Sequence, residues 1–153
     1  MNRFFCFTAV IVTAVLLVSC SILKINRSAN EQGIVPDLPA SIEFSKGFRL
    51  FWNDLQLETQ GLTSLEDYQP SKQMQRDNNI IVLSDGVFGI QGFMQVLPPL
   101  FDALTFEQLG GVLTYFSEGV YTFSMPVKSL PALLEVKGII QIEMSQKIFL
   151  KRS

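Results

Sequence analysis

The stretch "VLPPLFDALTFEQLGGVLTYF", Val96 to Phe116, decides which fold the sequence predicts. After the two prolines, Thr105 and Gln108 form a capping box, which predicts a helix from Phe106 to about Ser117. The pair Gly110–Gly111 falls inside that helix, although a helical glycine costs about 1 kcal/mol relative to alanine. The pair therefore indicates that another helix approaches closely at this point.

The partner in this crossing is predicted near the start of the folded region. The stretch "SIEFSKGFRLFWNDL" forms an amphipathic helix with Ser41 as its cap. Gly47 and Phe51 stand four residues apart in it, as do Gly111 and Tyr115 in the later helix, so each pair shares one helix face. We expect the two helices to cross with each glycine beneath the aromatic ring of the other.

The remaining elements are less sharply defined. A short helix is predicted from Ser129 to Val136, and the apolar run Ile80–Leu83 fits a strand or a buried helical turn equally well. Residues 139–153 form a C-terminal tail in which alternating apolar residues predict a short strand. The expected fold is a mostly α, small helical domain over residues 41–138.

The N-terminus has the pattern of a signal peptide. A single basic residue, Arg3, precedes an uncharged run from Phe4 to Val18, which is shorter than the roughly 20 residues that cross a membrane comfortably. The run ends in "LVSC", which resembles the lipobox of bacterial lipoproteins. This resemblance implies that residues 1–19 are removed, that Cys20 carries the lipid and that residues 20–40 are a flexible tether. In the alternative, Cys20 is only a small residue near an ordinary cleavage site or in an uncleaved anchor.

Composition excludes several function classes. The 153 residues are 48% hydrophobic and carry a net charge of -2, which suits neither a disordered chain nor a nucleic-acid-binding surface. The chain has no histidine, no Ser/His/Asp set, no phosphate-binding glycine loop and no zinc pattern. We therefore expect no enzyme, no metal and no nucleic-acid partner.

The stretch "RDNNIIVLSDGVFGIQGFMQVLPPLFDALTFEQLGGVLTYF", Arg76 to Phe116, is similar to the C-terminal half of class I c-type cytochromes. In that family a proline-rich turn precedes a last helix that ends in Val-Leu-Thr-Tyr. A first helix of the form Gly-x-x-x-aromatic extends the resemblance to about Gly47. The resemblance implies a cytochrome c-like helical domain.

The family's haem ligands are missing at the matching positions. Placing Phe51 on the aromatic residue of the first helix puts Leu55 and Glu58 where the family has its cysteines and Thr59 where it has its histidine. Leu97 stands at the position of the methionine ligand. Because the chain contains no histidine, we expect no haem and no other cofactor.

The volume of a lost haem must then be filled, because protein interiors are close-packed. The sequence offers a set of nine large apolar residues: Phe48, Trp52, Leu55, Leu57, Phe88, Phe93, Leu97, Phe101 and Phe116. These side chains either fill the former pocket or line a groove for an apolar ligand or partner, and periodicity does not separate the two.

The function predicted from these features is that of a non-catalytic lipoprotein. It would be lipid-anchored to a membrane of the bacterial cell envelope, face the periplasm or exterior, and serve as an accessory subunit of a redox assembly. The alternatives are a carrier or sensor of a small apolar ligand in the vacated pocket and, less favoured, an electron carrier with non-covalent haem.

Overall fold

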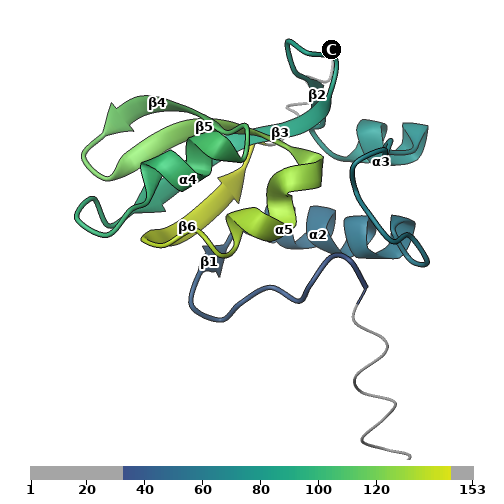
Figure 1. Ribbon diagram of the computed structural model, residues 1–153, viewed down its shortest axis with the longest axis horizontal. Coiled ribbons are helices and arrows are strands. Elements are labelled where there is room, and N and C mark those ends of the chain that lie inside the picture. The colour runs from purple at the N-terminus through teal and green to yellow at the C-terminus, as the bar shows by residue number, and fades with distance from the viewer. Residues whose placement is uncertain (1–32, 146–153) are drawn as a thin grey trace, which may run out of the picture. The chain divides into compact units, whose positions relative to one another are not determined.

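A computed structural model describes residues 33–145, which lie in the second of two compact units of the chain, Gly33–Ser153 (Figure 1). Cys20 and the predicted signal peptide lie outside the described residues. The elements in chain order are β1 (Glu43–Phe44), α2 (Lys46–Glu58), α3 (Lys72–Asp77), β2 (Ile81–Val82), β3 (Phe88–Val96), α4 (Ala103–Gln108), β4 (Val112–Ser117), β5 (Val120–Pro126), a 3-10 turn (Val127–Ser129), α5 (Leu130–Leu133) and β6 (Ile139–Met144).

The strands form one six-stranded mixed sheet. Its order is β1–β6–β3–β5–β4, and β2 pairs with the beginning of β3. Among the described strands, only β1 and β6 pair in parallel. At the centre of the sheet Met94 of β3 lies opposite Tyr121 of β5 and Ile142 of β6, so β3 is the strand that joins the two halves.

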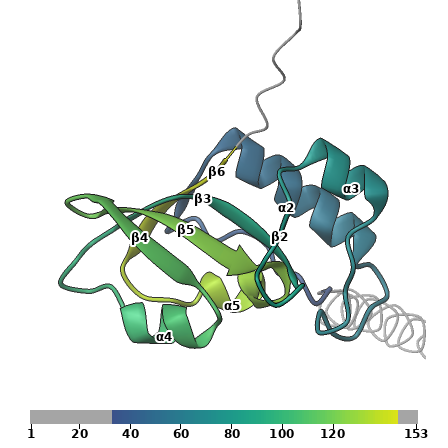
Figure 2. The same cartoon turned by 90° about the horizontal axis from the view of Figure 1, so that it is seen from above.

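The sheet is covered by helices on one face. Ile90, Met94 and Val96 of β3 are buried, whereas the alternate residues Gln91 and Gln95 are exposed, as expected for a strand with one face in the core. The helices contribute their buried side chains to the same face: Phe48, Trp52, Phe106, Leu130 and Leu133. Both views place the β4–β5 hairpin and α4 at one end of the sheet, and α2 with α3 at the other (Figures 1 and 2).

The helix α2 begins later than the sequence predicts. Its N-cap is Ser45, whose hydroxyl accepts a hydrogen bond from the Phe48 amide at 3.2 Å, so the predicted cap at Ser41 is wrong. Trp52 fixes the preceding segment, because its indole Nε1 donates to the carbonyl of Pro36 at 2.8 Å. Val35 is buried as well, so the last part of the predicted tether packs with the domain.

The prediction of a mostly helical, cytochrome c-like fold is wrong, because the structure is mixed α/β with about equal helix and strand content. The decisive error lies in the quoted stretch. Its helix is short, is capped by Asp102 rather than by Thr105, and ends at Gln108. Gly110 then takes a φ of +82°, which ends the helix, and the residues from Val112 form the strand β4.

The predicted helix crossing is wrong for the same reason. Gly47 and Phe51 are helical, but Gly111 lies between α4 and β4, and Tyr115 pairs with a residue of β5 within the sheet. The absent side chain of Gly111 has a local cause: a Cβ atom there would overlap the ring of Phe106, which is fully buried. The glycine leaves room for the helix's own aromatic anchor, not for a second helix.

The other elements follow the sequence more closely. β6 lies where alternation predicts a strand, and it is an inner strand of the sheet between β1 and β3. The short helix near Ser129 is present as α5, although it ends at Leu133. Ile81 and Val82 form the strand β2, which settles the ambiguity of that apolar run, and α3 was not predicted.

Gly92→Ala should destabilise the domain strongly. A Cβ atom at Gly92 would overlap the backbone carbonyl oxygen of Glu143, which cannot move without parting β3 from β6. Overpacking of this kind costs about 1–3 kcal/mol or more. Gly33→Ala is the control, since a Cβ there meets nothing within 4 Å. Urea unfolding measures both variants, and equal midpoints would contradict the close approach of the two strands.

Candidate functional site: the apolar end of the sheet

The four positions that match haem ligands do not surround a common pocket. Leu55 is fully buried in the last turns of α2, and the Thr59 hydroxyl donates to its carbonyl at 2.7 Å, closing the helix. Glu58 lies beside them on the surface. Leu97 lies beyond the far end of β3, where its amide donates to the carbonyl of Gly138 at 2.8 Å. The substituted positions are thus divided between a helix end and a distant loop.

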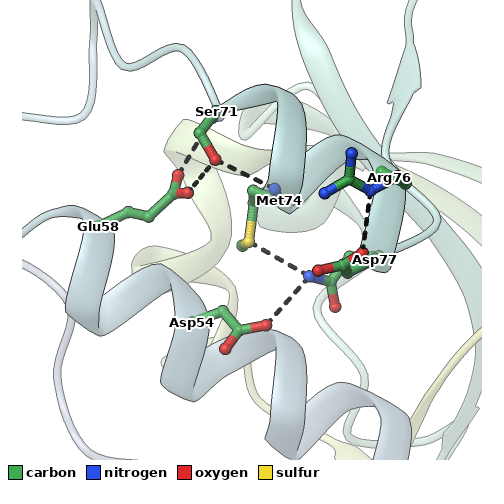
Figure 3. Close-up of polar contacts among 7 residues, drawn as sticks. Asp54, Glu58, Ser71, Met74, Arg76 and Asp77 are labelled. Atoms are coloured by element: carbon green, nitrogen blue, oxygen red, sulfur yellow. Dashed lines mark hydrogen bonds and ion pairs between the residues drawn. The ribbon is translucent and has the colours of Figure 1, made fainter.

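Glu58 instead ties α2 to α3 (Figure 3). Its carboxylate accepts hydrogen bonds from the Tyr68 hydroxyl at 2.7 Å, from the Ser71 amide at 3.2 Å and from the Ser71 hydroxyl. The same Ser71 oxygen accepts from the amide of Met74 and so caps α3. The cluster therefore connects the end of one helix to the start of the next.

Electrostatics agree with this structural role. Burial raises the pKa of Glu58, but the hydrogen bonds from Ser71 and Tyr68 outweigh it and hold the pKa below the ordinary value of 4.5. Burial and the neighbouring Glu58 raise the pKa of Tyr68 well above its usual range. The Ser71 hydroxyl is occupied both as donor and as acceptor. A lowered carboxylate pKa and an occupied hydroxyl favour helix capping over acid–base or nucleophilic chemistry.

Within residues 33–145 no group of three or more acidic, cysteine or histidine side chains lies close enough to hold a metal ion. Every buried side-chain nitrogen or oxygen of this region has a hydrogen-bond partner. The polar groups of this region therefore form no candidate centre, and the candidate site lies on the apolar surface.

The nine large apolar residues expected to fill a haem pocket do not act as one set. Phe48, Trp52 and Leu55 are buried in the core. The rings of Phe48 and Trp52 stack there, with their centroids 5.6 Å apart. Phe88 and Phe101 are half-buried. The other four are exposed: Leu57, Phe93, Leu97 and Phe116. Three of the nine residues therefore belong to the core, and four others of the nine lie on the surface.

Exposed apolar side chains gather where β3, α4 and the β4–β5 hairpin meet, a region that both views show at one end of the sheet (Figures 1 and 2). We call this surface the apolar end and define it by six residues that are 46% to 67% exposed: Leu97, Leu100, Leu104, Val112, Tyr115 and Phe116. Large contiguous apolar surfaces on a folded domain mark sites of interaction.

Hydrogen bonds and ring contacts hold the segments of the apolar end against one another. The Val96 amide donates to the carbonyl of Gly119 at 2.8 Å, which holds the hairpin turn against the end of β3. On the helix-covered face the ring of Tyr121 lies 6.0 Å from Tyr115 and 6.3 Å from Phe101. On the open face Phe116 meets Phe93 edge-on at 5.5 Å. The aromatic side chains therefore extend around the outer strand on both faces.

The outer strand β4 is also an open edge. It is the last strand of the sheet and pairs only with β5 among the residues described. In an antiparallel pair, half of the backbone N–H and C=O groups point away from the partner. β4 has six residues, none of them charged and none of them proline, so it lacks two of the features that commonly protect an edge strand. Its one irregularity is a register shift between Tyr115 and Ser117.

The chain segment that contains β4 is acidic, although Lys137 of a later segment lies beside Asp102. Residues 78–127 contain no lysine or arginine, and their acidic residues are Asp85, Asp102, Glu107 and Glu118. Glu107 precedes β4 and Glu118 follows it directly. Hydrogen bonds from the backbone and side chain of Thr105 lower the pKa of Asp102, so this carboxylate stays ionised at neutral pH.

Sequence reasoning missed this edge because it assigned Val112–Phe116 to a helix. The signal was present: "VLTYF" combines β-branched and aromatic residues directly after two glycines, which favours a strand.

Comparisons with protein-family models, curated proteins and solved structures found no match to this chain. No helix of the described region has the length and apolar character that crossing a bilayer requires.

Glu58→Gln should flatten the acid dependence of stability. Because the folded pKa of Glu58 is lowered, its ionised form stabilises the domain above about pH 4.5, and this contribution is lost as the pH falls through the folded pKa. The urea concentration at the unfolding midpoint, measured between pH 7 and pH 3, should be higher for the wild type than for the variant only at the higher pH. Glu143→Gln, which removes a carboxylate from the open face, is the control. A constant difference across the range would contradict the helix-tying role of the carboxylate.

Proposed function

We propose that this chain is a non-catalytic lipoprotein of the bacterial cell envelope, anchored through Cys20, that acts as an accessory subunit by binding a partner protein. The domain would face the periplasm or exterior. The observation that carries the proposal is the apolar end, where six exposed apolar side chains adjoin an unprotected strand edge. The lipobox supports the anchor.

A protein suits this surface better than a lipid bilayer does. Free backbone N–H and C=O groups on β4 need hydrogen-bond partners, which lipid tails do not offer. The acidic residues on either side of the strand in the sequence, Glu107 and Glu118, would be repelled by anionic headgroups. A partner protein can supply both the backbone groups and the opposite charge.

The redox part of the sequence-based hypothesis loses its support. A redox assembly was suggested by the cytochrome resemblance, and the mixed α/β fold is not the helical domain that this resemblance implies. The ligand-carrier alternative depended on a vacated haem pocket in the same fold. The positions that would have lined it are now core residues, such as Leu55, or surface residues, such as Leu97. The accessory role therefore stands on the exposed surface alone.

Cys20→Ser should release the chain from the membrane. Without the thiol no lipid can be attached, and the variant is expected in the soluble fraction after cell lysis and detergent-free washing. Cys6→Ser is the matched control, because Cys6 belongs to the predicted signal peptide, so this variant should stay membrane-bound. Fractionation followed by immunoblotting reads both. A Cys20→Ser chain that remains with the washed membranes would contradict lipidation.

A photocrosslinking residue at Leu104 should capture a protein partner in intact cells. Leu104 lies in the apolar end and is 66% exposed. Leu57 is the matched control, because it is 64% exposed and belongs to α2 at the other end of the domain. We expect one reproducible protein adduct from position 104, identified by mass spectrometry and lost when Leu100→Asp is added.

Three outcomes of this crosslinking would overturn the protein-binding role. Adducts of equal yield from Leu104 and Leu57 would mean that the contacts are non-specific. Adducts of Leu104 that contain only lipid would assign the surface to the membrane. Adduct formation that is insensitive to Leu100→Asp would place the contact outside the apolar end.

A further inference from the structure

The two edge strands of the sheet, β1 and β4, differ in length and in charge. The edge strand β1 has only two residues and carries the charged Glu43, both of which discourage pairing with another chain. β4 at the opposite edge is six residues long, uncharged and free of proline. Within residues 33–145 one edge of the sheet is protected and the other is left open, which is the geometry of a strand acceptor.

We infer that β4 binds an extended segment of the partner protein by strand addition, and that this segment is apolar with lysine or arginine at its ends. This inference rests on the proposed protein-binding role of the apolar end. The outward backbone groups of β4 supply the hydrogen bonds, and the segment becomes the next strand of the sheet, beside Val112–Ser117.

The register shift limits where the added strand can pair. From Val112 to Tyr115 the residues of β4 lie in regular register with β5, with Thr114 opposite Thr122. The shift falls between Tyr115 and Ser117, where the turn begins. Regular pairing therefore extends over about four residues of β4, enough for a short segment held at alternate backbone positions.

Side chains on both faces of the edge would contact the added strand. Val112, Thr114 and Phe116 lie on the open face, where Phe116 is buttressed by Phe93. Tyr115 lies on the helix-covered face and is held by the ring of Tyr121. Alternate side chains of an incoming strand would meet these two groups in turn. The aromatic side chains thus favour an apolar segment.

The acidic residues near β4 favour basic residues at the two ends of the bound segment. Glu107 precedes β4 and Glu118 follows it in the sequence, and residues 78–127 hold no basic side chain. Because Lys137 lies beside Asp102, the cap of α4, the acidic rim of the edge consists of Glu107 and Glu118. A second copy of the chain pairing through β4 would bring its own acidic residues to this edge, which disfavours self-association. Lysine or arginine flanking an apolar segment would complement the acidic rim, with an attraction that salt screens.

The test uses the full chain in detergent and a fluorescent probe peptide, Lys-Lys-Ile-Thr-Val-Thr-Val-Lys-Lys, in anisotropy titrations. The basic peptide should bind about tenfold more tightly than the same peptide with glutamate at its ends, and less tightly as salt is raised. Methylating the amides on one edge of the peptide should abolish binding, and methylating the other edge should not. Binding should protect β4 amides from hydrogen exchange.

Val112→Lys should weaken binding of the basic peptide about tenfold, because it places a cation on the edge. Val82→Lys is the matched control: Val82 is also a strand valine and is 64% exposed against 61% for Val112, but it belongs to β2. Equal effects of the two variants, equal binding of the basic and acidic peptides, or indifference to methylation would overturn the inference. So would a dimer of the free chain that Val112→Lys dissociates, since the occupant would then be a second copy.

Failure of the inference and failure of the proposed function can be told apart. If no peptide binds but the crosslink from Leu104 persists, the partner uses the apolar end without strand addition, and only the inference is overturned. If neither is observed, the protein-binding role fails with it.

Discussion

The structure depends on the central strand β3 having neighbours on both sides at close range. At Gly92 the backbone of β6 approaches so closely that no side chain fits, and the same residue lies opposite Phe123 of β5. The missing side chain at Gly92 permits the register in which β3 pairs with β6. Because side chains alternate along a strand, that register places Met94 and Ile142 on the helix-covered face together. The one-sided core follows from it.

Because helices cover only one face of the described sheet, its edge strand β4 depends on the local packing around α4. The helices α2, α4 and α5 bury one face, and α4 reaches the sheet through the ring of Phe106, which lies 6.4 Å from the ring of Phe123 on β5, the strand beside β4. The fully buried Phe106 requires Gly111 beside it, and Gly110 turns the chain from helix to strand. The glycine pair therefore positions the edge strand directly after the helix that supports it.

The sequence predicted the two ends of the domain better than its middle. The burial of Phe48, Phe51, Trp52 and Leu55 on α2 follows from helical periodicity, and β6 follows from alternation. The residues Val112–Phe116 fit both a helical and a strand pattern, and the capping pattern at Thr105 favours a long helix, which the strand β4 contradicts. The similarity to cytochromes rested on residue identities in this ambiguous stretch. Such identities do not distinguish a helix from a strand, so they did not indicate the different fold. Exposure of Leu100 and Leu104 is a tertiary property that no local pattern encodes.

Exposed apolar residues on a strand edge are costly for a free-standing protein, because they invite association with any other edge. In this domain the two features that would reduce that risk, charge and proline, are absent from β4 but present nearby: Glu107 and Glu118 flank the strand, and Pro98 and Pro99 lie in the loop before α4. Acidic flanks repel a second copy while leaving the backbone free for a partner of opposite charge. The acidic residues thus discourage pairing with a second copy of the chain, while the edge of β4 stays accessible to another protein. Selective recognition of a partner requires both properties.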